Sequence, residues 1–207
     1  GVEQQITCVD GSTFQMYMAN MKSIFMDMIK NTDMVIFNRC KKEDPLPTYR
    51  RGIKVANQRA EVIFEDEEGE LGDIFQDEMP FDMNAPVIEI LPEDYGIWFV
   101  DAMDHPENYE GKTVKFKARV MKPRGMGSKF FVPGRTAMTC CADDTTFLGY
   151  VCKSAYAPKL TPGEWVEVTA KVGIEKRNEY QGEEGIVLSA EHVEQCDPLE
   201  DEMVYFN

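Results

Sequence analysis

The chain has 207 residues, of which 22 are Lys or Arg and 37 are Asp or Glu, so its formal net charge is −15 at pH 7. Hydrophobic residues make up 43% of it, enough to build a core, and its length predicts one domain or two small ones. A charge of this sign and size repels polyphosphates at long range, which argues against general nucleic-acid binding.

The sequence gives no sign of a membrane or secretory segment. No apolar run reaches the ~18 residues that a spanning helix needs, and the first residues do not show a charged stretch followed by an apolar one. The six cysteines are too sparse for a disulfide scaffold, so we expect reduced thiols. These features predict a cytoplasmic protein without membrane insertion.

The first part of the chain, residues 1–85, alternates strand and helix patterns. Short apolar runs at 6–9, 34–37 and 61–64 have the length of buried strands. Helices are expected at 16–30 and 49–57, the first because Met18, Met21, Phe25, Met28 and Ile29 recur at helical spacing. This alternation predicts a parallel α/β sheet. Residues 65–78, with eight acidic side chains, are expected to form a solvated loop.

The second part, residues 86–207, is predicted to be mainly β. After an expected helix at 93–104, residues 114–120 and 166–172 alternate apolar and polar side chains, as half-buried strands do. Further short strands are expected at 130–132, 136–140, 147–152 and 185–193, separated by turn signals at 123–125, 133–134 and 162–163. Five or six short strands predict a small closed barrel of the oligonucleotide/oligosaccharide-binding (OB) type. The expected fold class is therefore α/β followed by all-β.

Residues 6–64 resemble the C-terminal part of the catalytic domain of CobW-type metallochaperone GTPases. The matching segments are the strand ending at Asp10, the run from Asp33 to Arg39, and the turn from Asn57 to Ala60 before the next strand. In that family a guanine-binding Asn-Lys-x-Asp motif follows the second of these strands. Here Asn38 matches the Asn, Arg39 replaces the Lys, and Lys41 stands where the Asp is expected. The resemblance implies nucleotide-binding roles for Asn38 and Arg39.

The phosphate-binding loop Gly-x-x-x-x-Gly-Lys-Ser/Thr does not occur in the sequence. Without its amides and its Lys, this chain has no means of holding nucleotide phosphates and magnesium. We therefore expect no enzymatic activity from this chain, and GTP and Mg²⁺ only in a longer parent protein. The expected partners are the missing N-terminal GTPase half and a protein client of metal delivery. The uncovered side of the Met-rich helix predicts self-association.

The second part resembles the soluble C-terminal domain of an uncharacterised family of bacterial proteins named as permease subunits. The residues that carry this resemblance are Pro106 to Lys112, Phe131 to Arg135, Thr139 to Asp144 and Gly163 to Val166. The resemblance implies a role in metal transport or homeostasis. The membrane-spanning part of that family does not occur here, so permease activity is not implied.

Adjacent cysteines are the sharpest chemical feature. Cys140 and Cys141 could bind zinc as thiolates, with Asp143 or Cys152 completing the site. Successive side chains of a regular strand point to opposite faces, so such a site needs a bulge. The alternative is structural, with one thiol in the core and the other half exposed. The metal hypothesis names zinc as the expected ion.

A basic stretch precedes the cysteine pair. Residues 111–142 contain no acidic side chain, and Lys115, Lys117 and Arg119 alternate along one predicted strand. Together with Arg135 they predict a face for an anion or an acidic partner. An ordinary solvated strand face is the alternative.

Two function hypotheses follow. The first is a C-terminal fragment of a CobW-like GTP-binding protein involved in metal delivery or homeostasis. The second is a non-enzymatic binding module in which the OB-like barrel docks a protein partner or an acidic ligand.

Overall fold

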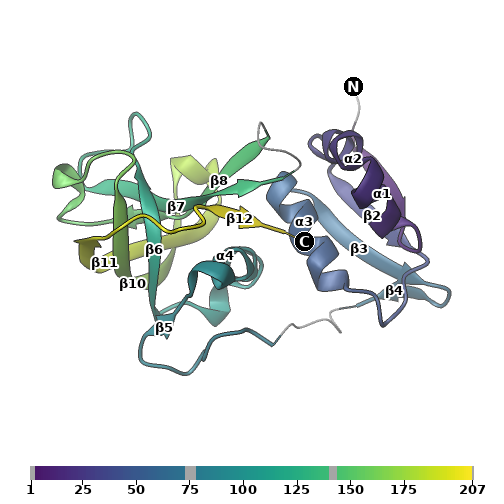
Figure 1. Cartoon of the computed structure of the whole chain (residues 1–207), viewed down its shortest axis with the longest axis horizontal. Coiled ribbons are helices and arrows are strands. Elements are labelled where there is room, and N and C mark those ends of the chain that lie inside the picture. The colour runs from purple at the N-terminus through teal and green to yellow at the C-terminus, as the bar shows by residue number, and fades with distance from the viewer. Residues whose placement is uncertain (1–2, 73–77, 140–143, 207) are drawn as a thin grey trace. The chain divides into compact units, whose positions relative to one another are not determined.

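The computed structural model describes residues 3–72, 78–139 and 144–206. The chain forms two compact units (Figure 1), one mainly Gly1–Glu78 and the other Met79–Ala137 with Phe147–Val204. The structure divides at Glu78, whereas the sequence predicts a boundary near residue 85. Within the described ranges, no helix is both long and apolar enough to cross a membrane.

The first unit is a four-stranded sheet with helices between its parallel strands. Its elements are β1 (Ile6–Asp10), α1 (Phe14–Asn20), α2 (Lys22–Ile29), β2 (Met34–Asn38), α3 (Leu46–Ala56), β3 (Glu61–Asp66) and β4 (Gly69–Leu71). The strand order is β1-β2-β3-β4, with β1, β2 and β3 parallel. The antiparallel β3–β4 hairpin occupies part of the acidic segment expected to be a loop.

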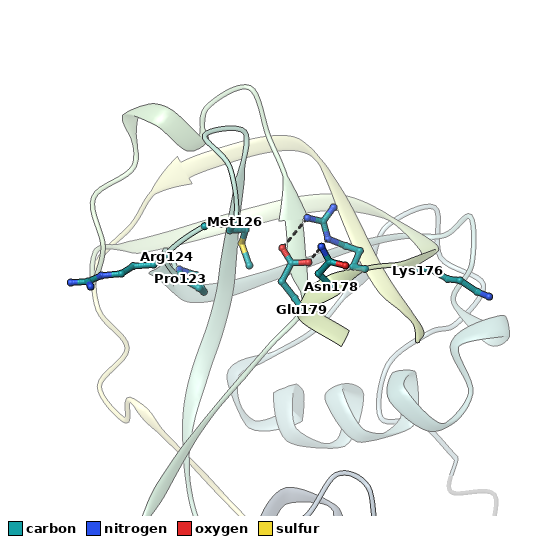
Figure 2. Close-up of a pocket in the computed structure, with 8 residues that line it drawn as sticks. Pro123, Arg124, Met126, Lys176, Asn178 and Glu179 are labelled. Atoms are coloured by element: carbon teal, nitrogen blue, oxygen red, sulfur yellow. Dashed lines mark hydrogen bonds and ion pairs between the residues drawn. The ribbon is translucent and has the colours of Figure 1, made fainter. Parts of the chain in front are cut away.

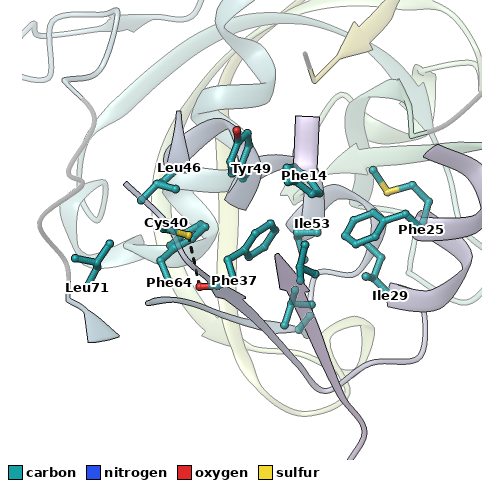
Figure 3. Packing of buried hydrophobic residues seen from close by; sticks show 14 residues of the cluster. Phe14, Phe25, Ile29, Phe37, Cys40, Leu46, Tyr49, Ile53, Phe64 and Leu71 are labelled. Atoms are coloured by element: carbon teal, nitrogen blue, oxygen red, sulfur yellow. Dashed lines mark hydrogen bonds between the residues drawn. The ribbon is translucent and has the colours of Figure 1, made fainter. Parts of the chain in front are cut away.

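Aromatic side chains fill the core of this unit (Figure 3). The Phe14 ring lies 4.5 Å from the Tyr49 ring, 4.9 Å from Phe37 and 5.2 Å from Phe25, centroid to centroid, in edge-to-face arrangements. Such pairs contribute about 0.5–1.5 kcal/mol each beyond their buried area. The packing joins α1, α2 and α3 to one face of β2.

The single helix expected at 16–30 is two helices, α1 and α2. Met21 lies between them with φ −138° and ψ 31°, outside the helical region. The Asn20 side-chain amide donates to the carbonyl of Met16 at 2.9 Å, a local bond of the kind that competes with helix continuation. The break shifts the buried face, so Met21 and Met28 are 42% and 52% exposed while Met26 is buried.

The second unit contains one longer helix and a strand-rich remainder. Its elements are β5 (Ile88–Glu89), the 3₁₀ turns η1 (Pro92–Asp94) and η2 (Pro106–Asn108), α4 (Tyr95–Asp104), β6 (Thr113–Met121), β7 (Phe130–Met138), β8 (Thr145–Gly149), β9 (Val151–Lys153), η3 (Ala157–Lys159), β10 (Trp165–Lys176), η4 (Asn178–Tyr180), β11 (Glu184–Gln195) and β12 (Met203–Tyr205).

Five of these strands close into a barrel. β6 pairs with β7, β7 with β9, β9 with β11, β11 with β10, and β10 with β6 again. Only the β9–β11 pair is parallel, and this closed 1-2-3-5-4-1 order is that of the OB barrel. The fold class expected from the sequence, α/β followed by an OB-like barrel, is confirmed.

A turn predicted inside the barrel does not form. Pro133 and Gly134 lie within β7, paired with Val120 and Arg119 of β6. A side chain at Gly134 would collide with the Leu148 carbonyl and the Phe147 ring. The glycine is therefore needed so that β8 can approach β7. In the sequence alone, the same Pro-Gly pair is a turn signal.

The barrel interior has two distinct parts. Beside α4, the Trp98 and Phe116 rings lie 4.9 Å apart and the Phe99 and Tyr150 rings 4.7 Å apart. A separate cluster is made of Met126, Val132, Val151 and Val187. Met126 belongs to the loop between β6 and β7. Its side chain packs against this cluster in the barrel interior.

Candidate functional site

A pocket of about 510 Å³ lies between two connections of the barrel (Figure 2). One wall is the β6–β7 loop, with Pro123, Arg124, Gly125 and Met126. The other is the end of β10 with η4, and it contributes Lys176, Arg177, Asn178 and Glu179. We call this the loop pocket. In OB barrels the corresponding two loops flank the position where ligands bind.

Glycines give the first wall its shape. Gly125 and Gly127 have φ angles of 84° and 91°, in the left-handed region that favours glycine. Between them Met126 is 8% exposed and packs against the small apolar cluster. The loop is thereby fastened by one buried side chain while Arg124 stays exposed beside it.

Arg177 is held on two sides. Its Nε and Nη2 atoms donate to the two carboxylate oxygens of Glu179, each at 3.0 Å. Its guanidinium carbon lies 4.2 Å from the centroid of the Phe130 ring. The Arg177 bond lowers the pKa of Glu179, and the same bond raises the pKa of Arg177. Such a bidentate, stacked arginine is fixed in orientation.

The other two cations of the loop pocket stand at its rim. Arg124 and Lys176 are exposed and point outward to opposite sides, with Glu179 between them in Figure 2. Neither makes an ion pair with any residue that the structure describes. Three cations to one carboxylate give this pocket a positive balance in a chain whose net charge is −15.

The predicted basic strand face is largely neutralised. Lys115 Nζ lies 3.2 Å from Glu167 and 3.6 Å from Glu89. Arg119 lies 3.5 Å from Glu202. Lys117 is opposite Glu167 in the β6–β10 register. Acidic side chains from other parts of the chain thus share this face. They lie outside residues 111–142, so the charge of that segment does not include them.

Arg135 does not lie on that face, which corrects its assignment there. It is 2% exposed, and its guanidinium donates to the backbone carbonyls of Pro92, Asp201, Glu202 and Met203 at 3.2–3.4 Å. It also lies 5.7 Å from the Tyr95 ring and 5.9 Å from the Trp165 ring. Arg135 therefore holds the C-terminal segment in place rather than presenting a charge to a ligand.

Asn38 and Arg39 lie at the carboxyl end of β2, beside the carboxyl end of β1. Arg39 has a φ of 54°, and its Nη1 lies 3.1 Å from Oδ2 of Asp10. Asn38 is exposed, and its backbone carbonyl accepts from Gly11 N at 2.8 Å. Ligands of parallel sheets bind at this edge, so the position is compatible with the nucleotide-binding roles, which stay predictions.

The metal hypothesis rests on residues that the structure describes only in part. Cys140, Cys141 and Asp143 lie outside the described residues. Cys152 is fully buried in β9, and burial raises the pKa of its thiol to about 12. A thiolate ligand is disfavoured there. Across the described residues, no group of three or more His, Cys, Asp or Glu side chains is placed to hold a metal ion.

Sequence reasoning missed the second wall of the loop pocket. Lys176, Arg177 and Glu179 were not singled out, whereas Arg124 belongs to the predicted basic stretch 111–142 and to the turn signal at 123–125. The available signal was the break after the alternating strand, where Arg177-Asn178-Glu179 and Gly182 mark a tight connection. Their proximity to the β6–β7 loop depends on barrel closure, which one sequence does not display.

Similar solved structures include the mitochondrial single-stranded DNA binding protein Rim1 from S. cerevisiae, at 10% identity and a TM-score of 0.26. That match covers 42% of this chain and 97% of Rim1, and selenomethionine-labelled Rim1 gives the same values. Another is the aspartyl tRNA synthetase from Entamoeba histolytica, at 15% identity and a TM-score of 0.30, covering 64% of this chain and 30% of the synthetase.

No curated protein matches the sequence. The model of the DUF1980 C-terminal domain matches residues 70–206, which contain the whole barrel and α4. This range includes the segments on which the resemblance to the permease-subunit family rested. The match does not reach residues 6–64, so the resemblance of that part to CobW-type GTPases stays a prediction. By this match over most of its length, the chain belongs to the DUF1980 C-terminal domain family.

Proposed function

We propose that the barrel is a non-enzymatic binding module that docks an acidic segment of a protein partner in the loop pocket. The observation that carries this proposal is the positive balance of the pocket, with Arg124, Lys176 and Arg177 against Glu179. Carboxylates are matched by the fork of an arginine, and Arg177 is already oriented for such a contact.

The charge of the whole chain favours a short acidic segment over a long polyanion. The Debye length is about 8 Å at physiological ionic strength, so an acidic peptide in the pocket is shielded from most of the other carboxylates. A long polyanion would extend across a surface that contributes to a net charge of −15. This difference supports an acidic protein segment as the ligand.

The aromatic side chains beside the pocket favour the same choice. Single-stranded nucleic acids bind OB barrels by stacking bases on exposed rings. Here the Arg177 guanidinium covers the Phe130 ring at 4.2 Å. The Tyr180 hydroxyl donates to the Ile186 carbonyl at 2.6 Å and accepts from Val151 N at 3.0 Å, which fixes that ring in the barrel wall. Both rings are partly buried against the small apolar cluster, so neither is the exposed ring that base stacking requires.

The metal-delivery function implied by the GTPase resemblance is a separate proposal. It depends on Cys140 and Cys141 and on residues 6–64, and it requires a different measurement, the zinc titration given below. The two proposals are compatible, because an acidic segment of a client protein could dock on the barrel of a metal-delivering protein.

Fluorescence anisotropy of a labelled, short Glu-rich peptide tests the docking function. The double variant Arg124→Gln/Lys176→Gln should bind about tenfold more weakly, since two rim charges at about 0.7 kcal/mol each give that factor. The matched control is Lys159→Gln/Lys171→Gln, which removes the same charge from exposed positions outside the pocket. Equal affinity of the two variants, or tighter binding of oligo-dT than of the peptide, would contradict the proposal.

A further inference from the structure

Glu179 occupies the place on Arg177 that a ligand carboxylate would take. The two residues form a fork-to-fork pair, Nε to Oε2 and Nη2 to Oε1, with both distances 3.0 Å. This is the geometry by which arginine recognises a free carboxylate. Both side chains line the loop pocket.

The Arg177–Glu179 ion pair contributes little to holding the fold together. Arg177 and Glu179 are two residues apart in the same turn, so their ion pair joins no distant elements. The turn is fixed by other contacts: Tyr180 N and Gly182 N donate to the Arg177 carbonyl, and the Tyr180 hydroxyl bonds to β9 and β11. Phe130 supports the guanidinium from the barrel side. Arg177 would therefore keep its place if Glu179 released it.

The surroundings are suited to an exchange of carboxylates. The Arg177 and Glu179 side chains are 17% and 26% exposed, so solvent and ligand can reach the pair. Nη1 of Arg177 donates no hydrogen bond to any residue in the described ranges. Arg124 and Lys176 at the rim leave the pocket with a positive charge even when Arg177 is paired with Glu179. The pocket therefore still attracts the carboxylate of a ligand.

We propose that Glu179 is an internal competitor, a built-in carboxylate that an acidic ligand must displace from Arg177 in order to bind. This inference rests on the proposed function and adds how its affinity is set. The ligand class is a carboxylate side chain presented by an acidic peptide. Glu179 prevents isolated carboxylates such as free acetate from binding Arg177. Acetate would gain only the contact that Glu179 loses, and the turn keeps Glu179 close to the guanidinium.

The test is peptide affinity in Glu179→Gln, with Glu183→Gln as the matched control. Glu183 lies in the same connection, is exposed and carries the same charge, but does not bond the Arg177 side chain. Glu179→Gln should bind the Glu-rich peptide about tenfold more tightly than Glu183→Gln. Adding Arg177→Gln to the Glu179→Gln variant should abolish this gain in affinity. Equal affinities of the two single variants would overturn the inference.

A second measurement needs no peptide. The ¹H–¹⁵N signal of Arg177 Nε is followed while acetate is added to the wild type and to Glu179→Gln. The inference predicts a saturable shift only in the variant, and no saturable shift in the variant would overturn it. If the variant responds to acetate while neither protein binds the peptide, the competitor role stands and the docking function falls.

Discussion

Replacing Arg135 with Met should detach the C-terminal segment from the barrel. Arg135 is 2% exposed, and its guanidinium is the common donor to four backbone carbonyls, three of them in residues 201–203. Met has a similar length and fills most of the same space, so the substitution removes the donors with little loss of apolar packing.

The size of the effect follows from the bond lengths. A charge-assisted hydrogen bond contributes about 1.5–3 kcal/mol at good geometry, but distances of 3.2–3.4 Å are at the long end. The carbonyls of residues 201–203 can take up water once the segment detaches, which reduces the penalty for leaving them without Arg135. We therefore expect a loss of about 3 kcal/mol in the free energy of unfolding.

Urea unfolding followed by Trp fluorescence measures this loss, and hydrogen exchange measures the detachment directly. The amide protons of β12 should lose protection in Arg135→Met while those of β10 keep it. The control is Arg124→Met, the same exchange at an exposed position, which should change stability by no more than about 0.5 kcal/mol. A loss below about 1 kcal/mol with unchanged protection of β12 would refute the reasoning.

Three further predictions concern the thiols and the nucleotide. Burial raises the pKa of Cys152 from 9.0 to about 12, so the unfolded chain loses this proton first and stability should fall above pH 9, by about 1.4 kcal/mol at pH 10. Cys152→Ala should flatten that part of the pH profile of the urea midpoint, and identical profiles would contradict the assignment. If Cys140 and Cys141 form a zinc site, the reduced wild type should bind zinc with proton release and the double Cys→Ser variant should not, whereas equal, weak uptake by both would remove the metal role. Because the sequence lacks a phosphate-binding loop, a labelled GTP analogue with Mg²⁺ should not bind, and saturable binding at micromolar concentration would show that reasoning to be wrong.

The barrel could be predicted because its strands alternate in sequence. Val114, Phe116 and Ala118 are buried and the Lys and Arg residues between them are not, as expected of a strand with one face on a core. The helix break at Met21 could not be predicted from apolar spacing, because that spacing indicates burial and is blind to local bonds such as the one from the Asn20 amide to the Met16 carbonyl. Likewise, Gly134 marks a close approach between strands, which looks the same as a turn signal in one sequence.

The candidate site was less accessible from the sequence. The predicted basic face counted charges along one segment, whereas Glu89, Glu167 and Glu202 reach it from elsewhere in the chain. Arg135 was assigned to that face because nothing in its neighbours indicates that backbone carbonyls enclose it. The loop pocket needs two connections that are about 50 residues apart, and only closure of the barrel brings them together.

Mapping of the acidic peptide onto the folded protein tests the central claim most directly. In a ¹H–¹⁵N titration of the full chain with the short Glu-rich peptide, the largest shifts should fall on residues 123–126 and 176–179, the two walls of the loop pocket. The Arg177 Nε signal should shift with the same affinity as these amides. Shifts centred instead on the β6 face around Lys115 and Lys117, or saturable binding without any shift in the two walls, would contradict the account.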